Sequence, residues 1–301
     1  MASYIDKKLI EAGLKVTDAK LCEEDKIWSR YSDDKVNIGD ELAKVIRTLS
    51  KALPLSKKIK ALSVGSGDEP QLRILETACC GGLYLLDLEK EALDIVEERL
   101  RRQNIGHVTT ILCDYNKVFL NPKKTELFLK ANLGREKIGL ITLHHSLYYC
   151  KEDAWHMLFN NLYRYILAPR GAIHAVLMAA ESNDTYSTTW LYNHFVGKFF
   201  GMRNNQNLPR FKKDLQRDPL YRKAQILMAR SRIRFFVDDF EKFMAVIWMI
   251  LLYPQVHDYS LKQREEITEF IYKKFWQKKM PLIQMQDHLT IYRGIDFNGL
   301  I

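Results

Sequence analysis

The sequence predicts an α/β protein with a doubly wound, mostly parallel sheet of the Rossmann-like kind, extended by N-terminal helices and a helical insertion. Three observations predict this fold. Between residues 59 and 178, short β-rich runs alternate with helical stretches, which is typical of parallel strands joined by crossover helices. A glycine-containing turn follows the first run. With 47% apolar and 28% charged residues, the composition is that of a folded globular chain.

The elements are expected in the following order. Residues 1–55 form two or three helices, the clearest over 40–53, where apolar side chains recur on one face. Five strands are predicted at 60–64, 82–87, 108–113, 138–144 and 171–178. One helix is predicted between each strand and the next, at 70–78, 89–102, 122–133 and 152–167. Residues 180–233 are then expected to form a polar, aromatic and basic insertion.

The C-terminal part is predicted to be helical first and extended last. Residues 239–252 indicate a strongly apolar helix, and Ser260 with Gln263 has the spacing of a capping box that opens another. Residues 281–293 suggest a closing pair of strands with a turn near Gln286 and Asp287. Since no internal repeat or low-complexity linker is evident, we predict a helical cap over 1–55 and one elaborated domain over 56–301.

The composition also bears on location. The longest apolar run, 243–253, has 11 residues, whereas a membrane helix needs roughly 20. The N-terminal residues include charges where a secretory signal would be apolar. Five cysteines at irregular spacings fit neither a disulfide framework nor a zinc site. We therefore expect a cytoplasmic protein with reduced thiols, no membrane contact and no metal.

The net charge of +9 is unevenly distributed. Residues 203–234 contain ten basic and two acidic residues, which accounts for nearly all of the excess. Such a block is a solvated face, a phosphate-binding patch or a nucleic-acid footprint. Because no separate nucleic-acid-binding module is visible, a small-molecule partner is favoured and nucleic acid is kept as the alternative.

The turn after the first strand reads VGSGDEP (64–70). Glycines there allow the backbone to approach a ligand closely, next to the N-terminus of a helix. The dinucleotide fingerprint would need a third small residue where Pro70 stands. Asp68 and Glu69 would also repel a pyrophosphate, whereas S-adenosylmethionine (SAM) has no phosphate and carries an ammonium and a sulfonium. The turn therefore favours SAM over NAD or FAD.

Two further carboxylates follow the next two strands. Asp87 ends the second strand 22 residues after Gly65, where a carboxylate can accept hydrogen bonds from ribose hydroxyls. Asp114 follows the third strand, where together with Tyr115 it could hold the adenine amino group and stack on the ring. Both aspartates could instead be helix N-caps. Because parallel strands end at one edge of the sheet, the three signals support one another.

In this order of motifs the chain resembles the class I SAM-dependent methyltransferases over about residues 55–180. The stretch IKALSVGSG (59–67), with Ser63 where the family usually has an acidic residue, and the run SLYY (146–149) resemble the histamine N-methyltransferase-like branch. The resemblance implies a SAM site at the strand ends. Its residues would be Gly65, Ser66 and Gly67 for the methionine half, Asp87 for the ribose, Asp114 and Tyr115 for the adenine, and His144 and His145 beside the sulfonium.

The resemblance also implies an amine pocket. Its lining would be His145, Tyr148 and Tyr149, joined by Asp40 as the nearest acidic residue of the N-terminal helices and by Asp287 where the branch has an asparagine. Trp190 belongs to an aromatic cluster that would either cover the substrate or pack within a helix. Since an amine must lose a proton before it attacks the methyl group, His145 and Asp287 are the candidate bases.

The sequence thus predicts a SAM-dependent methyltransferase acting on a small molecule, with an amine as the expected acceptor. One alternative is an RNA or protein methyltransferase that grips its substrate through residues 203–234. Another is a SAM-fold binding protein without catalytic activity. No HExxH, GxSxG or Walker pattern supports a hydrolase or a metal enzyme.

Overall fold

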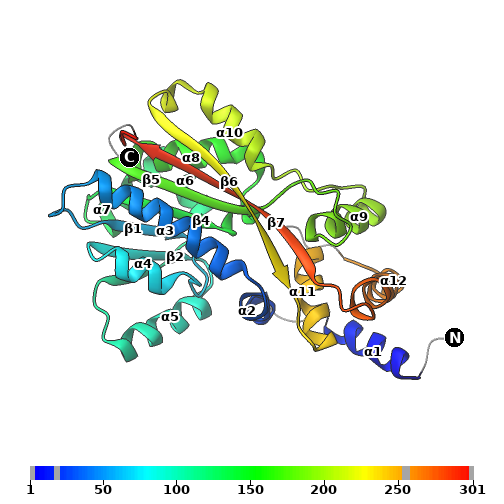
Figure 1. Cartoon of the computed structure of the whole chain (residues 1–301). Coiled ribbons are helices and arrows are strands. Elements are labelled where there is room, and N and C mark those ends of the chain that lie inside the picture. Colours follow the sequence, from blue (N-terminus) through cyan, green and yellow to red (C-terminus); the bar gives the residue numbers. More distant parts are fainter. Residues whose placement is uncertain (1–3, 17–20, 253–257, 298–301) are drawn as a thin grey trace. The chain divides into compact units, whose positions relative to one another are not determined.

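The computed structural model describes residues 4–16, 21–252 and 258–297. Its centre is a seven-stranded sheet with the order β3-β2-β1-β4-β5-β7-β6 (Figure 1). The strands are β1 (Lys60–Val64), β2 (Gly82–Asp87), β3 (Val108–Leu112), β4 (Ile138–His144), β5 (Leu167–Met178), β6 (Ala224–Phe235) and β7 (Leu282–Arg293). All four pairings among the first five strands are parallel. The predicted mixed α/β fold with a mostly parallel sheet is therefore confirmed.

Helices precede, connect and follow these strands. The first three are α1 (Tyr4–Lys15), α2 (Leu21–Tyr31) and α3 (Asp34–Ala52). Between the strands lie α4 (Leu72–Ala78), α5 (Lys90–Gln103), α6 (Tyr115–Phe119), α7 (Pro122–Asn132), η2 (Ser146–Tyr149), η3 (Glu152–Ala154), α8 (Trp155–Asn161) and η4 (Leu162–Ile166). The C-terminal half adds α9 (Thr188–Phe200), α10 (Leu208–Arg217), η5 (Pro219–Tyr221), α11 (Phe240–Leu252), α12 (Leu261–Ile271) and η6 (Tyr272–Trp276).

The chain forms two compact units, each assembled from separate stretches. Unit 1 comprises residues 1–37, 178–207 and 231–286. Unit 2 comprises residues 38–177, 208–230 and 287–301. The strands that carry the glycine turn and the predicted SAM residues belong to unit 2.

Unit 2 is built as a sheet covered on both faces. On one face, buried apolar residues of β1, β2 and β4 pack with α3, α4 and α5 in a cluster that includes Leu42, Leu75 and Leu140. On the other face, Ile141 and Leu143 of β4 pack with α6, α7, α8 and α10. Because side chains alternate along a strand, the even-numbered residues of β4 from Leu140 onward point toward the α3 and α4 side. His144 and Thr142 lie on that side.

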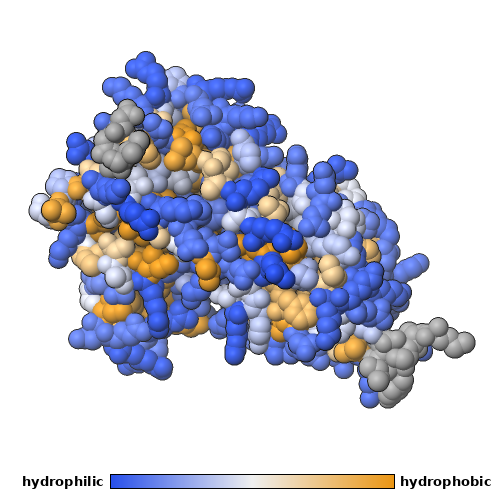
Figure 2. All heavy atoms as spheres, viewed as in Figure 1, coloured by the Kyte–Doolittle hydropathy of each residue, from blue (hydrophilic) through white to orange (hydrophobic). Residues whose placement is uncertain are grey.

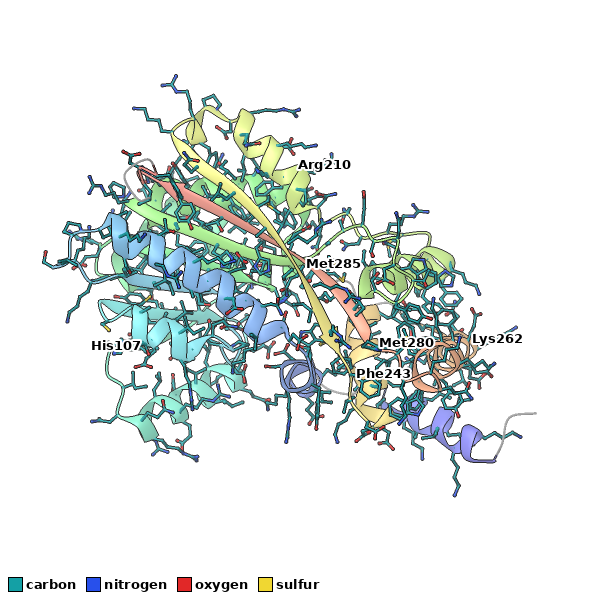
Figure 3. The ribbon with its side chains drawn as sticks, in the orientation of Figure 1. His107, Arg210, Phe243, Lys262, Met280 and Met285 are labelled. Atoms are coloured by element: carbon teal, nitrogen blue, oxygen red, sulfur yellow. The ribbon has the colours of Figure 1, made fainter. Side chains whose placement is uncertain are left out.

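Unit 1 has an aromatic core of its own. Trp28 stacks on Phe235, with ring centroids 5.5 Å apart, and Phe243 of the apolar helix α11 is fully buried among them (Figure 3). The predicted capping box is confirmed, since the Ser260 side chain accepts from the Gln263 backbone and the Gln263 side chain accepts from Ser260 N–H. No helix in the described part of the chain combines the length and apolar composition that a membrane crossing requires.

Two predictions about the C-terminal half are wrong. Residues 282–293 form one continuous strand, not a pair with a turn near Gln286 and Asp287. These polar residues are buried with partners: the Gln286 side chain donates to Asp34, and Asp287 is paired with Arg230. The insertion is also not wholly helical, because its end forms β6, in which basic residues alternate with apolar ones. Those basic residues are exposed, so the sequence of this edge strand resembles that of a polar, non-strand segment.

Candidate functional site

The glycine turn after β1 is held in a conformation that requires glycine. Gly65 has a φ of +67°, and a Cβ atom there would lie 2.4 Å from Ser146 Cβ. Gly67 has a φ of +52°, and nothing lies within 4 Å of the place where its Cβ would be. The first glycine is thus needed for the close approach of the loop after β4, and the second leaves open space beside the backbone. A turn of this kind can receive a ligand.

Asp87 ties this turn to the end of β2. Its Oδ2 accepts from Gly67 N–H at 2.6 Å, and its Oδ1 accepts from Glu89 N–H at 2.8 Å. The helix that follows begins at Lys90 with Glu89 at its N-cap, so Asp87 is not an N-cap. The carboxylate therefore orders the turn and lies where a ligand seated against Gly67 would meet it.

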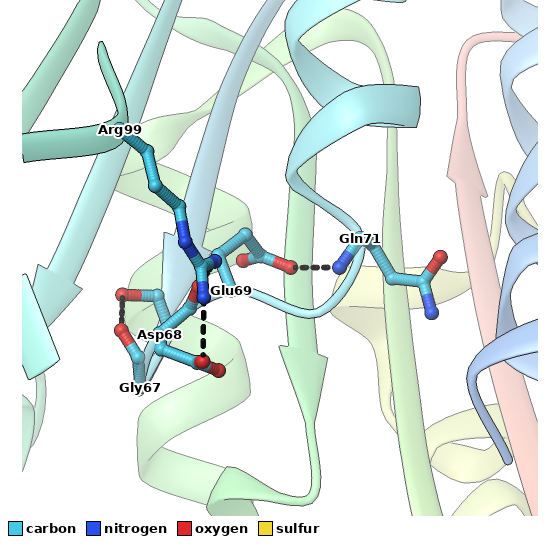
Figure 4. A network of polar contacts seen from close by, with 6 residues as sticks. Gly67, Asp68, Glu69, Gln71 and Arg99 are labelled. Carbon is cyan, nitrogen blue, oxygen red and sulfur yellow. Dashed lines mark hydrogen bonds and ion pairs between the residues drawn. The ribbon is translucent and has the colours of Figure 1, made fainter. Parts of the chain in front are cut away.

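A second carboxylate lies buried under the turn. Glu69 is 3% exposed and accepts from Ser63 Oγ with one oxygen. Its other oxygen accepts from Gln71 N–H at 3.1 Å (Figure 4). Burial raises its pKa to about 7, a shift that the two hydrogen bonds oppose and that Asp68 and Asp87 reinforce. Although Ser63 is not acidic, the first strand still has a carboxylate beside it, because Glu69, six residues later, accepts a hydrogen bond from Ser63.

Asp68 is neutralised from the neighbouring helix. Arg99 of α5 contacts the Asp68 carboxylate at 3.1 Å and its backbone oxygen at 3.0 Å (Figure 4). The turn nevertheless gathers three carboxylates, because Glu69 lies within interacting range of both Asp68 and Asp87. This arrangement favours a cationic ligand group and disfavours a pyrophosphate.

The two residues predicted to hold adenine have structural partners. Asp114 is the N-cap of α6, with Oδ1 accepting from Asn116 N–H at 3.0 Å, so the alternative of an N-cap is confirmed for this aspartate. Tyr115 is 7% exposed, and its hydroxyl donates to the Ser146 backbone oxygen at 2.6 Å. Tyr115 thereby joins the end of β3 to the loop after β4, and most of its ring is covered by the core of unit 2.

His144 is linked to the interior of unit 2. Its Nε2 lies 3.0 Å from Nδ1 of His174 on β5, which is fully buried. Burial, with the neighbouring histidines, lowers the pKa of His144 well below its usual range and that of His174 to about 3. Both imidazoles are therefore neutral near pH 7, and each bonds through one ring nitrogen to the other.

His145 adopts a left-handed φ of 54° at the start of η2. Its ring stacks on Tyr148 with centroids 5.8 Å apart, and its Nδ1 lies 3.4 Å from the Tyr148 hydroxyl. Tyr149 follows with about half of its surface exposed. The loop after β4 thus brings His145 and Tyr148 together, in the unit that carries the glycine turn.

The remaining predicted substrate residues lie elsewhere in the fold. Asp40 is exposed on α3. Asp287 on β7 is almost fully buried, and its two oxygens accept from Arg230 Nε and Nη2 at 2.6 and 3.0 Å. Trp190 lies on α9 in unit 1, in an aromatic cluster described below. Cys79, Cys80, Cys113 and Cys150 are free thiols, while the side chain of Cys22 lies outside the described part.

Two site residues were missed by sequence reasoning. Glu69 was read only as part of an acidic turn, although a serine at 63 followed by a glutamate at 69 could have indicated a relocated carboxylate. His174 was read as part of an apolar strand. A histidine within such a run was a signal for a buried polar partner.

The comparisons with known proteins concern the fold. No family model matches the chain, and no curated protein matches it in sequence. Among solved structures, YcgJ from Bacillus subtilis has a TM-score of 0.51 at 9% identity, covering 78% of this chain and 92% of its own. A Bacillus halodurans protein named as a candidate methyltransferase has a TM-score of 0.51 at 13% identity, covering 84% of this chain and 100% of its own. At these identities the likeness shows the Rossmann-like fold seen in methyltransferases.

Proposed function

We propose that this chain is a SAM-dependent methyltransferase whose acceptor is a small molecule, with an amine as the expected class. The observation that carries the proposal is the glycine turn, where Gly67 is bound to Asp87 and a buried Glu69 lies beneath. Three carboxylates around an open turn suit a cofactor that has an ammonium and no phosphate. The order of motifs and the fold support the same assignment.

The proposed cofactor residues fit SAM in chemical type. Backbone groups of Gly65, Ser66 and Gly67 would meet its methionine half, and Glu69 would compensate the ammonium. Asp87 keeps lone pairs for ribose hydroxyls while it accepts from Gly67 and Glu89. For the adenine we retain Asp114. Tyr115 instead stabilises the loop after β4, through the hydrogen bond from its hydroxyl to the Ser146 backbone oxygen.

When bound, SAM supplies a methyl group that its sulfonium already activates for transfer. The residues of this chain then have to hold the acceptor in line, exclude water and accept a proton. We assign to His145 the role of accepting the proton that the acceptor loses. Its imidazole and the Tyr148 hydroxyl form a polar pair on the loop after β4. We assign Asp287 a structural role, since both of its oxygens already accept from Arg230.

The experiment that tests the proposal is a turnover screen of the full chain with SAM. Amines, phenols, catechols and tRNA are offered in turn, and S-adenosylhomocysteine is quantified. We expect product only with small molecules, above all with amines. Binding of SAM without turnover of any acceptor would instead support the silent binding protein.

The acidic turn also predicts which cofactors are rejected. We expect SAM and S-adenosylhomocysteine to raise the melting temperature of the full chain, and NAD and FAD to leave it unchanged, because a pyrophosphate would meet Asp68 and Asp87. A thermal-shift series at matched ligand concentrations measures this. Stabilisation by NAD with none by SAM would contradict the methyltransferase proposal.

The basic segment is anchored in unit 2 by its apolar side. Phe211 of α10 packs on Trp155 and Phe159, with ring centroids 5.5 and 4.9 Å away. Its charged side faces solvent: Arg210 points outward from α10 (Figure 3), and the surface over this helix is hydrophilic (Figure 2). A hollow that includes Arg217 and Arg222 lies beside it, so the alternative of an anionic partner can be tested there.

We expect this basic surface not to bind RNA. If RNA bound through several phosphates, the affinity would fall with salt with a log-log slope of about 0.7 per phosphate. Binding of tRNA and of short single-stranded RNA is measured at two salt concentrations. The variant for comparison replaces Arg210, Lys212, Lys213 and Arg217 with Ser. Sub-micromolar, salt-sensitive binding that is lost in this variant would favour an RNA methyltransferase.

A further inference from the structure

Three rings of unit 1 lie close to the side-chain ammonium of Lys274. Its Nζ lies 4.3 Å from the ring centre of Trp190 and 5.1 Å from those of Tyr186 and Phe270. The His194 ring completes the group, stacking on Trp190 with centroids 4.5 Å apart and planes within 10°. We call Tyr186, Trp190, His194 and Phe270 the aromatic box.

Packing holds the box in place. Trp190 and His194 are four residues apart on α9, so they share one face of that helix. Phe270 of α12 is fixed by an edge-to-face contact with the buried Phe195, at 5.2 Å. Tyr186 makes the same kind of contact with Phe275, at 5.4 Å. The ring faces are therefore positioned by the core of unit 1 and not by Lys274.

Lys274 is held in an unusual way for a lysine. Within the described ranges its ammonium forms neither an ion pair nor a hydrogen bond with another residue. Burial lowers its pKa, an effect that the charge of Asp184 opposes and that of Lys278 reinforces. By contrast, the adjacent Lys273 reaches Glu269 at 2.8 Å. The direct contacts that the structure gives the Lys274 ammonium are those with the ring faces.

We propose that the aromatic box is a binding site for small methylated ammonium ions, and that Lys274 is its built-in competitor. A primary ammonium is strongly hydrated and has three N–H groups to satisfy, so it gains little from ring faces alone. A methylated ammonium has fewer or no donors and spreads its charge over methyl groups, which ring faces bind well. The box therefore selects methylated over unmethylated ions.

This assignment does not rest on methyl transfer, because it uses only side chains of unit 1. Methylated ammonium ions are nevertheless the product class of an amine methyltransferase. A site for them would allow the chain to retain or sense such a product. Binding at the box and turnover of SAM are measured separately, so either can fail alone.

Nuclear magnetic resonance of choline tests the proposal. A methyl group over aromatic faces is shifted upfield by their ring currents, so the choline methyl signal reports binding at the box. We expect weak binding to the parent chain and roughly tenfold tighter binding to Lys274→Ala, which removes the competing charge and opens the space. Lys274→Gln, which removes the charge but keeps most of the stem, should lie between them.

Matched controls separate a cation site from an apolar surface. Lys273→Ala removes a neighbouring charge outside the box and should bind choline like the parent. The alcohol 3,3-dimethylbutan-1-ol has the shape of choline without its charge and should bind at least tenfold more weakly to Lys274→Ala. Adding Trp190→Phe to Lys274→Ala should weaken choline binding several-fold, since a smaller ring attracts a cation less. Equal binding of choline and the alcohol, or no gain in Lys274→Ala over Lys273→Ala, would overturn the proposal.

Discussion

Replacing Asp87 with alanine is expected to weaken SAM binding about ten- to hundred-fold, since a charge-assisted hydrogen bond contributes about 1.5 to 3 kcal/mol. The substitution removes the proposed contact to the ribose. It also frees Gly67 N–H, which Asp87 Oδ2 holds at 2.6 Å, so the turn loses its tie to β2. Calorimetric titration of SAM into parent and variant measures the ratio of dissociation constants.

Asp94→Ala is the matched control for this prediction. Asp94 lies on the exposed side of α5, where it pairs with Lys90 at 2.7 Å. Its removal deletes a carboxylate close in sequence without touching the glycine turn, so SAM affinity should stay at the parental value. If folded Asp87→Ala binds SAM as tightly as Asp94→Ala, Asp87 is not part of the site.

Replacing Glu69 with glutamine is expected to stabilise the folded protein above pH 7 and to weaken SAM binding. Burial raises the Glu69 pKa from 4.5 to about 7, so the folded state binds its proton more tightly than the unfolded state does. The resulting stability is fully present below about pH 4.5 and is lost as the pH rises to about 7. At pH 8 the ionised carboxylate costs about 3 kcal/mol, from 1.36 kcal/mol per pKa unit. A glutamine of the same shape avoids that cost.

Urea unfolding at pH 5 and pH 8 measures this effect. Glu69→Gln should raise the unfolding free energy at pH 8 by a few kcal/mol and change it much less at pH 5. Glu24, whose pKa burial raises to about 8, contributes in the same direction in both proteins, so each variant is compared with the parent at the same pH. Glu89→Gln, at an exposed carboxylate near the turn, should match the parent at both pH values.

The same carboxylate predicts how SAM binding depends on pH. An ammonium next to Glu69 favours the ionised form, so SAM affinity should rise as the pH increases through about 7, and binding near that pH should release protons. In Glu69→Gln both effects should disappear, with affinity about tenfold lower at pH 8. A variant that keeps the parental affinity and pH dependence would show that Glu69 does not face the cofactor.

The first five strands could be predicted from the sequence because short β-rich runs alternate there with stretches that have a helical pattern. The glycine turn and Asp87 were predictable for a related reason, since strand ends in a parallel sheet converge on one edge. β6 was missed because an edge strand with outward arginines has the composition of a polar loop. β7 was divided in two because Gln286 and Asp287 look like turn residues until their partners Asp34 and Arg230 are known.

The site shows the same limit. Ser63 and Glu69 are six residues apart, and only the left-handed backbone at Glu69, with a φ of 48°, folds its side chain back onto the strand. The contact between His144 and His174 joins residues 30 positions apart through the pairing of β4 with β5. Local sequence patterns carry no signal for such pairs, because the sheet register brings them together.

Calorimetric titration of SAM into the full chain tests the central claim most directly. The claim is that the acidic glycine turn of unit 2 holds SAM. We predict saturable binding at one site per chain, tighter at pH 8 than at pH 6. A folded protein that takes up neither SAM nor S-adenosylhomocysteine at millimolar concentration would contradict it.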